Sequence, residues 1–277
     1  MKTAVIGLGL IGGSIAKAYK SASSNEVYGY DKDPSTLSYA KLSETIDDVL
    51  TDELLTQCEL IFIALYPGDT VDFLQNKASY FRKGAVVIDT CGVKRGVCEV
   101  GFDLAKRFGF TFVGGHPMAG TQFSGIKHSR ADLFNGASMV IVPPDFGDIA
   151  LLDKIKQLLF PLQLGKITIS TAEHHDDVIA YTSQLAHIVS SAYIKNKNAE
   201  NHVGFSAGSY KDMTRVATLN EKMWTELFLL NKDNLAGEID ELISSLSKYS
   251  KALKSGDEKA LYALLSEGTA RKCQLDG

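Results

Sequence analysis

The sequence predicts an α/β protein: a doubly wound, Rossmann-type and mainly parallel sheet, followed by an all-helical domain. Up to about Ser170, short β-branched runs alternate with amphipathic helical stretches, a pattern typical of parallel sheets. After Pro161 the chain has no further proline, and helical periodicity replaces the β-rich runs. We therefore expect one domain over residues 1–170 and a second, helical domain over residues 171–277.

The expected strands are short runs rich in β-branched residues. Most of them end directly before Gly, Pro, Asp or Cys, and ligands of open α/β sheets bind at the carboxyl ends of the strands. The runs cover residues 3–6, 27–31, 60–65, 85–89, 111–113, 138–142 and 167–169.

The first strand breaks into the pattern Gly7-x-Gly9-x-x-Gly12. In a dinucleotide-binding turn the first glycine permits the tight turn, the second lets the backbone approach a pyrophosphate, and the third lets the helix pack on the sheet. The amides of Leu10 and Ile11 would then face phosphate oxygens from a helix N-terminus.

An acidic residue, Asp31, ends the second strand nineteen residues after Gly12. A carboxylate at this point accepts hydrogen bonds from ribose hydroxyls and repels a 2′-phosphate, which favours NAD over NADP as the cofactor. Lys32 weakens that preference slightly. Leu65, Tyr66 and Cys91 follow the next strands and are expected to line the same cofactor site.

Composition limits the possible partners. The net charge is −4 and the basic residues are scattered, so we expect a small-molecule substrate, no nucleic acid and no membrane. The four cysteines show no metal-ligand or disulfide spacing, which favours reduced thiols and no metal. No apolar run approaches the length of a membrane span, and the apolar N-terminus is explained by a strand and a helix, so we expect a cytoplasmic protein.

The C-terminal region contains a seam of apolar residues at spacings of three and four: Ile239, Leu242, Leu246, Tyr249 and Leu253. Such a seam indicates a long helix with one apolar face. Burial against helices of the same chain and a dimer interface explain it equally well. We expect a homodimer formed through these helices.

Three regions of the sequence suggest chemistry. His116 follows a predicted strand within a glycine-rich loop that should lie beside the nicotinamide end of the cleft, so we favour a general base over a surface histidine in a turn. Asp176, Ser183 and His187 share one face of the first helix of the second domain, where a substrate could partner them. Arg215 could hold a carboxylate, although a helix-surface pair with Asp212 would explain it as well.

Taken together, these motifs resemble the prephenate dehydrogenases and their arogenate-using relatives. The resemblance runs over nearly the whole chain. It rests on the glycine turn up to Ser14, Asp89-x-x-x-Val93-Lys94, His116-Pro-Met-Ala-Gly120, His175-Asp176, Ser183-x-x-x-His187 and Thr214-Arg215-Val-Ala.

The resemblance implies NAD-dependent oxidative decarboxylation of prephenate to 4-hydroxyphenylpyruvate in tyrosine biosynthesis. His116 would take the proton of the C4 hydroxyl, Arg215 would fix a substrate carboxylate, and His187 would act at the side-chain end. The resemblance also places Ser183 and Thr121 against the substrate.

Three positions depart from the family pattern. Gly92 stands where a serine usually assists the catalytic histidine, so Thr90, Cys91 or water would have to replace it. Gln184 replaces a histidine, and Gln122 stands where some relatives have an acid. Gly92, Gln184 and Gln122 all belong to the expected substrate-binding set.

Other functions stay open at this point. The nearest is an arogenate or dual cyclohexadienyl dehydrogenase. A β-hydroxyacid dehydrogenase is more distant, because no lysine has the setting of its catalytic lysine. A non-catalytic NAD(H)-binding sensor is the alternative outside enzymes.

Overall fold

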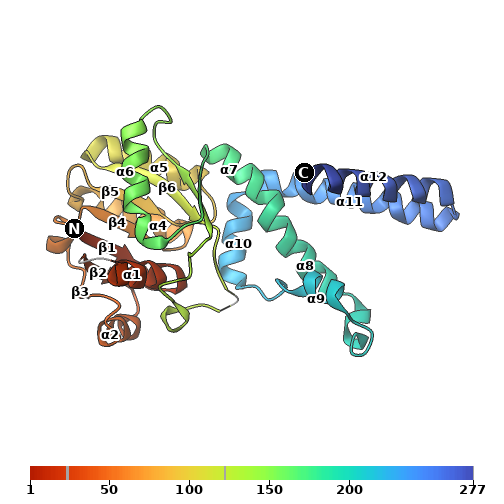
Figure 1. The fold of residues 1–277 in the computed structure, drawn as a ribbon, viewed down its shortest axis with the longest axis horizontal. Coiled ribbons are helices and arrows are strands. Elements are labelled where there is room, and N and C mark those ends of the chain that lie inside the picture. The colour runs from red at the N-terminus through yellow and green to blue at the C-terminus, as the bar shows by residue number, and fades with distance from the viewer. Residues whose placement is uncertain (23–24, 122, 277) are drawn as a thin grey trace.

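The computed structural model describes residues 1–22, 25–121 and 123–276 and confirms the expected fold class. A sheet domain is followed by helices that extend away from it, ending in a hairpin of two long helices (Figure 1). None of the helices in these ranges combines the length and apolar character that a bilayer crossing requires.

The sheet has the strand order β3-β2-β1-β4-β5-β6-β7-β8. All neighbours are parallel except β6 and β7, which are antiparallel. The strands are β1 (Lys2–Ile6), β2 (Glu26–Tyr30), β3 (Asp48–Val49), β4 (Leu60–Ile63), β5 (Val86–Asp89), β6 (Thr111–Pro117), β7 (Ser138–Val142) and β8 (Lys166–Ile169).

Alternation along the buried strands supplies both faces of the sheet. Val5 and Phe62 pack under α1, α2 and α6, whereas Ile6 and Ile61 pack under α3, α4 and α5. These helices are α1 (Leu10–Ala22), α2 (Pro34–Leu42), α3 (Asp52–Leu55), α4 (Pro67–Lys77), α5 (Arg95–Phe108) and α6 (Ile149–Leu158). Short 3₁₀ turns cover Ala78–Tyr80, Ile126–His128 and Phe160–Leu162.

The described part of the chain after β8 is helical, as expected. Its elements are α7 (Ala172–Ile179), a π-helical segment (Ala180–Leu185), α8 (Ala186–Ile194), a 3₁₀ turn (Lys197–Asn201), α9 (Gly208–Thr214), α10 (Glu221–Leu230), α11 (Lys232–Ser255) and α12 (Glu258–Asp276). The π-helical segment inserts wider turns into the first helix of this region, so Asp176 and His187 are not related by one regular α-helical face.

The apolar seam of α11 divides into two parts. Ile239 and Leu242 pack on a core formed by Ala180, Leu185 and Leu235. Further along, Leu246 and Leu253 are 58% and 65% exposed on the hairpin that α11 forms with α12. Both interpretations of the seam therefore describe part of it: burial within the chain for its first half, and an uncovered apolar surface for its second half.

The helical region is joined to the sheet domain through Arg95 at the start of α5. Its guanidinium donates to the carboxylate of Asp233 at 2.6 and 2.7 Å and to the side-chain oxygen of Asn231 at 2.9 Å. The beginning of α11 is thus held against the beginning of α5, next to the carboxyl ends of the central strands.

Candidate active site

The glycine-rich turn between β1 and α1 has the geometry that dinucleotide binding requires. Gly7 has φ +85°, and a Cβ there would lie 2.4 Å from the Ala64 carbonyl oxygen. A Cβ on Gly12 would lie 1.8 Å from the Gly7 oxygen, whereas a Cβ on Gly9 would meet nothing within 4 Å. Gly7 and Gly12 therefore serve the fold, and Gly9 borders open space in front of the first turn of α1, which Leu10 and Ile11 begin.

Asp31 lies directly beside this turn. One carboxylate oxygen accepts a hydrogen bond from the Leu8 amide at 2.8 Å, and the other accepts one from the Asp33 amide at 3.0 Å. A carboxylate has further lone pairs to offer, so it can still accept from a ribose. Lys32 is turned toward Asp69, 3.2 Å away, which partly offsets its charge near the ribose position.

The other expected cofactor residues follow β4 and β5. Leu65 and Tyr66 are half-buried, and Tyr66 precedes the first turn of α4. Cys91 differs from the expectation: its thiol is buried, 3.3 Å from the Thr70 hydroxyl and 3.6 Å from the Leu65 carbonyl oxygen. Burial raises the pKa of Cys91, so this side chain is a neutral packing group rather than one that faces a ligand.

His116 belongs to a strand and not to a loop, which corrects the sequence-based expectation. It pairs with Val140 across the antiparallel β6–β7 ladder. The preceding glycine is needed for packing, because a Cβ on Gly115 would lie 2.4 Å from the Asp89 carbonyl oxygen. The imidazole is partly exposed, so it can contact a bound molecule while its position is set by the sheet.

A chain of hydrogen bonds runs from His116 to a buried carboxylate. His116 Nδ1 lies 2.9 Å from His175 Nε2, and His175 Nδ1 lies 2.7 Å from Asp176 Oδ1. Burial, followed by the neighbouring His175 and the charge of Lys94, lowers the pKa of His116 well below its ordinary value of 6.5. His116 is therefore neutral at neutral pH and able to accept a proton.

Asp176 binds the beginning of α5 as well as His175. Its carboxylate accepts from the Lys94 amide at 2.7 Å and the Arg95 amide at 3.0 Å, so it also caps that helix from α7. Burial opposes ionisation, but the hydrogen bonds from His175 and the two amides outweigh it and lower the pKa of Asp176. The partner of this acid is the protein itself, not a substrate.

A second buried carboxylate, Asp89, holds the strand ends together. It accepts from the Cys91 amide at 2.8 Å, from the Gly115 amide at 3.1 Å, and from the ammonium of Lys94. Burial alone would lower the pKa of Lys94, but the charge of Asp89 outweighs it and raises the pKa, so the ion pair persists. This pair positions Gly115 and thereby His116.

Gly92 lies between His116 and the helical region. A Cβ there would be 3.3 Å from Leu227 and 4.0 Å from His116 Nε2. The two side chains expected from the sequence to replace the serine are engaged elsewhere: the Thr90 hydroxyl donates to the Ile63 carbonyl oxygen, and the Cys91 thiol contacts the Thr70 hydroxyl. His175 contacts the ring from the other side, at Nδ1.

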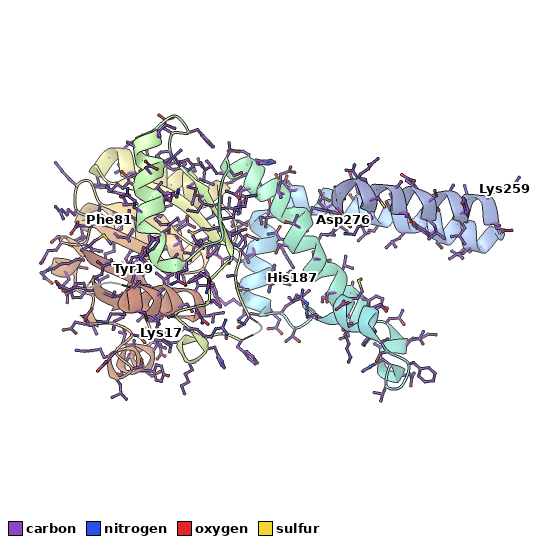
Figure 2. All side chains as sticks on the ribbon, viewed as in Figure 1. Lys17, Tyr19, Phe81, His187, Lys259 and Asp276 are labelled. Atoms are coloured by element: carbon purple, nitrogen blue, oxygen red, sulfur yellow. The ribbon has the colours of Figure 1, made fainter. Side chains whose placement is uncertain are left out.

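Helix α10 forms a wall of the site that the sequence analysis did not identify. Leu227 is the nearest neighbour of the Gly92 position, and one turn earlier Trp224 packs on His187 with ring centroids 4.0 Å apart. Figure 2 labels His187 between α8 and α10. Tryptophan carried no pattern in the sequence, so only its position in space reveals this contact.

Arg215 lies near enough to His187 for its charge to act on the ring. His187 Nδ1 lies 2.8 Å from the Ser183 carbonyl oxygen and donates to it, which leaves Nε2 as an acceptor. Burial lowers the pKa of His187, and the charge of Arg215 lowers it further. Arg215 is exposed just after α9, and within the described chain it forms no ion pair with Asp212.

Two expected substrate contacts are placed elsewhere. Gln184 is buried, its amide nitrogen donates to the Leu227 carbonyl at 3.3 Å, and its oxygen accepts from Asn231 at 2.9 Å. It joins helices instead of facing a substrate. The hydroxyl of Thr121 lies 3.2 Å from both the amide and the carbonyl of Phe123, in an exposed turn, and Gln122 lies outside the described residues.

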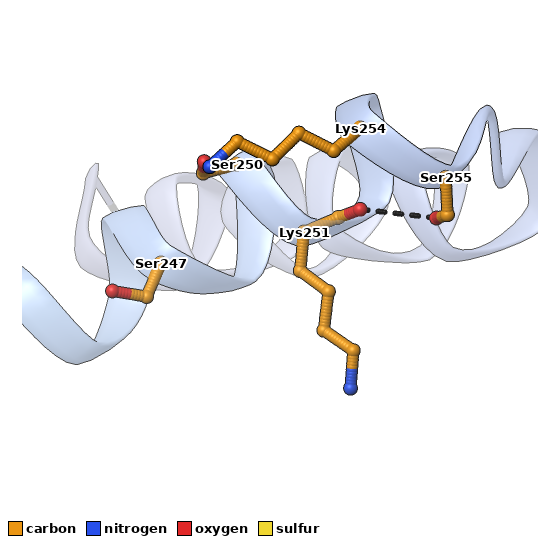
Figure 3. A pocket seen from close by; sticks show the side chains of 5 residues that line it. All are labelled: Ser247, Ser250, Lys251, Lys254 and Ser255. Atoms are coloured by element: carbon orange, nitrogen blue, oxygen red, sulfur yellow. Dashed lines mark hydrogen bonds between the residues drawn. The ribbon is translucent and has the colours of Figure 1, made fainter.

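A hollow of about 540 Å³ lies elsewhere, on α11 in the hairpin, lined by Ser247, Ser250, Lys251, Lys254 and Ser255 (Figure 3). None of the expected site residues lines it. Among the described residues, no group of three or more His, Cys, Asp or Glu side chains is placed to hold a metal ion.

A phosphate-accepting turn on one side and a neutral histidine backed by a carboxylate on the other suit a nucleotide-dependent oxidoreductase, which removes a proton while a hydride leaves. The fold and site define that class of protein. Family models agree over most of the chain: the nucleotide-binding domain of prephenate dehydrogenase matches residues 15–167, and its dimerization domain matches residues 171–267. The chain belongs to the prephenate dehydrogenase family.

Individual relatives differ in the substrate that they are named for. A prephenate dehydrogenase of Bacillus subtilis is 29% identical over 92% of this chain and 71% of the relative. The structure of an arogenate dehydrogenase from Synechocystis has a TM-score of 0.81 and 25% identity, covering 99% of this chain and 100% of that one. A prephenate dehydrogenase from Aquifex aeolicus in complex with hydroxyphenyl propionate and NAD⁺ has a TM-score of 0.79 and 26% identity, over 99% and 98% of the chains.

Proposed function

We propose that this protein is an NAD-dependent prephenate dehydrogenase, which converts prephenate to 4-hydroxyphenylpyruvate, CO₂ and NADH in tyrosine biosynthesis. The observation that carries the proposal is the pairing of His116 with His175 beside the carboxyl ends of the central strands. A neutral base at this place suits a reaction in which a hydroxyl loses its proton as its carbon loses hydride.

The residues present fit a dinucleotide. Gly9 borders open space, the first turn of α1 offers unpaired amides, and Asp31 has acceptor capacity left for a ribose. NAD, when bound, supplies the hydride acceptor. Asp31 favours NAD over NADP, because a 2′-phosphate would be placed against its negative charge. The complex of the Aquifex aeolicus relative supports the same cofactor.

His116 and Arg215 would divide the work on the substrate. The C4 hydroxyl gives its proton to His116 Nε2 as hydride leaves C4, and the bond to the ring carboxylate breaks with its electrons entering the ring. CO₂ departs, and the protonated histidine can return its proton to the phenolic oxygen. Arg215 would hold a substrate carboxylate by charge-assisted hydrogen bonds, and His187 with Ser183 would line the side-chain end.

Arogenate is the second candidate substrate, because the Synechocystis relative is named for it. Arogenate carries an ammonium group where prephenate carries a keto oxygen, so it needs an acceptor. The free Nε2 of His187 is such an acceptor, whereas Gln184, buried between helices, is not available for this role.

The domain and assembly expectations follow from the same architecture. We propose that residues 1–170 bind the nucleotide, and that residues 171–277 complete the substrate site and form a homodimer. The match of residues 171–267 to a dimerization domain and the exposed half of the α11 seam support the dimer.

The test is the formation of NADH by the purified protein with prephenate or arogenate, with NADP⁺ run in parallel. We expect a rate on prephenate with NAD⁺ that exceeds the rate with NADP⁺ at least tenfold. A rate on arogenate alone would establish the second candidate. Binding of NAD⁺ without turnover of either substrate would contradict the proposal and favour a non-catalytic sensor.

A further inference from the structure

We infer that His175 and Asp176 are positioning residues that fix the tautomer of His116, so that its basic nitrogen is Nε2 on the Gly92 side of the ring. This inference rests on the proposed function only for its kinetic readout. The proton arrangement that it predicts belongs to the free protein and can be measured without a substrate.

The argument begins at Asp176, whose side chain is almost fully buried. Its two oxygens face the amides of Lys94 and Arg95, Arg95 Nε at 3.3 Å and His175 Nδ1. All four of these groups can donate, and an ionised carboxylate can only accept. His175 must therefore carry its proton on Nδ1.

The next step follows from the protonation state of His175. Burial lowers the pKa of His175, which keeps the ring neutral near pH 7. A neutral imidazole with a proton on Nδ1 has an unprotonated Nε2, which can only accept. His116 Nδ1, 2.9 Å away, must therefore be the donor.

The consequence falls on the other nitrogen of His116. With its proton held on Nδ1, neutral His116 presents a lone pair at Nε2, the atom 4.0 Å from where a Cβ on Gly92 would lie. When His116 takes up a proton there, His175 and the charge of Asp176 stabilise the resulting imidazolium. This is the logic of a base oriented by a third group, which recurs on unrelated folds.

The charged groups around His116 and His175 determine the direction in which the pKa of His116 shifts. The charged and titratable groups around the two histidines are Asp89 and Lys94 in the turn from β5 to α5, Arg95 at the start of α5, and Asp176 on α7. Lys94 lowers the pKa of His116, and Asp176 raises it. Removing the charge of Asp176 should therefore lower the pKa of His116 further.

The decisive variant is Asp176→Asn. Its amide oxygen can still accept from the Arg95 amide, but its NH₂ group takes the place of Oδ1, so it no longer accepts from the Lys94 amide and donates to His175 Nδ1. This moves the His175 proton to Nε2 and the His116 proton to its own Nε2. We expect kcat at neutral pH to fall at least a hundredfold, within the range of about 10⁴ that such a change causes in a serine protease triad. We expect the KM for the substrate and the affinity for NAD⁺ to change less than threefold.

Two readouts separate this effect from simple damage to the fold. Nitrogen-15 NMR of histidine-labelled protein should show His116 protonated on Nδ1 in the native chain and on Nε2 in Asp176→Asn. The acid limb of the kcat/KM profile should move to lower pH in the variant. Asp177→Asn, at the exposed neighbouring position on α7, is the matched control and should change neither readout.

A second pair of variants covers the case in which Asp176→Asn does not fold. His175→Gln keeps an acceptor within reach of His116 Nδ1 and should retain activity within about tenfold, whereas His175→Leu should lose at least fiftyfold in kcat. His174→Leu, at an exposed position, is the control.

A native protein with His116 protonated on Nε2 would overturn the inference, as would equal activity in His175→Gln and His175→Leu. A native Nδ1 proton together with no turnover of prephenate or arogenate would leave the proton arrangement standing and remove the proposed function instead.

Discussion

The carboxylate of Glu226 accepts a hydrogen bond from the backbone amide of Gly68, 2.6 Å away. Glu226 belongs to α10 and Gly68 to the first turn of α4, where no side chain of the preceding residue caps the helix. A carboxylate at that place satisfies an unpaired amide and interacts favourably with the helix dipole. One contact therefore joins the helical region to the edge of the expected cofactor site.

Replacing the Glu226 carboxylate should weaken the contact between α10 and α4. We expect Glu226→Ala to lower the free energy of unfolding by about 1 kcal/mol, because a charged helix cap is lost. The melting temperature would fall by roughly 2 to 4 °C for a chain of this size. Glu241→Ala, at an exposed position on α11, provides the control in the same thermal denaturation experiment. Equal melting temperatures for the two variants would contradict a stabilising role for Glu226.

Replacing the proposed base should separate chemistry from binding. We expect His116→Asn to lower kcat by about two orders of magnitude or more, since a general base contributes about that factor. The dissociation constant for NAD⁺, measured by calorimetry, should stay nearly unchanged. Unaltered turnover would remove His116 from the mechanism.

The lowered pKa of His116 predicts the pH profile. The neutral imidazole is the active form, so activity is lost as the pH falls through the pKa of His116. Because burial and the neighbouring charges hold that pKa well below 6.5, the acid limb of kcat/KM should lie well below pH 6.5. The contrary result is an acid limb at or above pH 6.5 that disappears in His116→Asn. It would show that the pKa of His116 is not lowered.

The glycine turn offers a contrast between fold and ligand. Gly12→Ala would place a Cβ 1.8 Å from the Gly7 oxygen, so we expect a loss of more than about 2 kcal/mol in stability or failure to fold. Gly9→Ala meets no protein atom within 4 Å. We expect it to fold normally and to weaken NAD⁺ binding at least tenfold, because its methyl group would occupy the space for the pyrophosphate. Normal NAD⁺ affinity in Gly9→Ala would move the cofactor away from this turn.

Arg215 should act mainly in binding. We expect Arg215→Ala to raise the KM for prephenate by at least tenfold, since a charge-assisted hydrogen bond contributes about 1.5 to 3 kcal/mol. Arg215→Lys keeps the charge but not the two-pronged geometry. Its KM for prephenate should therefore lie between those of Arg215→Ala and the native protein. Steady-state kinetics check this, and a native KM in Arg215→Ala would contradict the assignment.

Most of the sheet follows from local sequence because buried parallel strands are continuous β-branched runs. The strand β3, with only Asp48–Val49, is too short to leave such a run. The end of β6 was predicted to be a loop because Gly114, Gly115 and Pro117 usually interrupt strands. In the folded chain, residue 115 must be glycine because the Asp89 carbonyl oxygen comes too close for a Cβ. The two positions are 26 residues apart, so no local pattern reveals this contact.

The candidate active site also depends on contacts between distant parts of the chain, which local sequence does not reveal. His116 stands out from its neighbours in the sequence, but its partner His175 is 59 residues away and comes from another element. His175 and Asp176 lie within a run of five ionisable residues on α7, residues 173–177, so no local pattern separates the two buried side chains from their exposed neighbours. Gln184 was misjudged since its place in the motif suggested a ligand contact, whereas the π-helical segment directs its amide to Leu227 and Asn231.

The position of His116 within β6 also separates two properties that an enzyme must evolve. The proposed proton acceptor, His116, and the His175–Asp176 pair behind it are tied to the sheet and to the start of α5, whereas Trp224, Leu227 and Arg215 come from α10 and the end of α9. Substitutions on those helices can change which ring side chain is accepted while the reacting nitrogen keeps its place. A common ancestor could thus give rise to enzymes for different cyclohexadiene acids without rebuilding the chemistry.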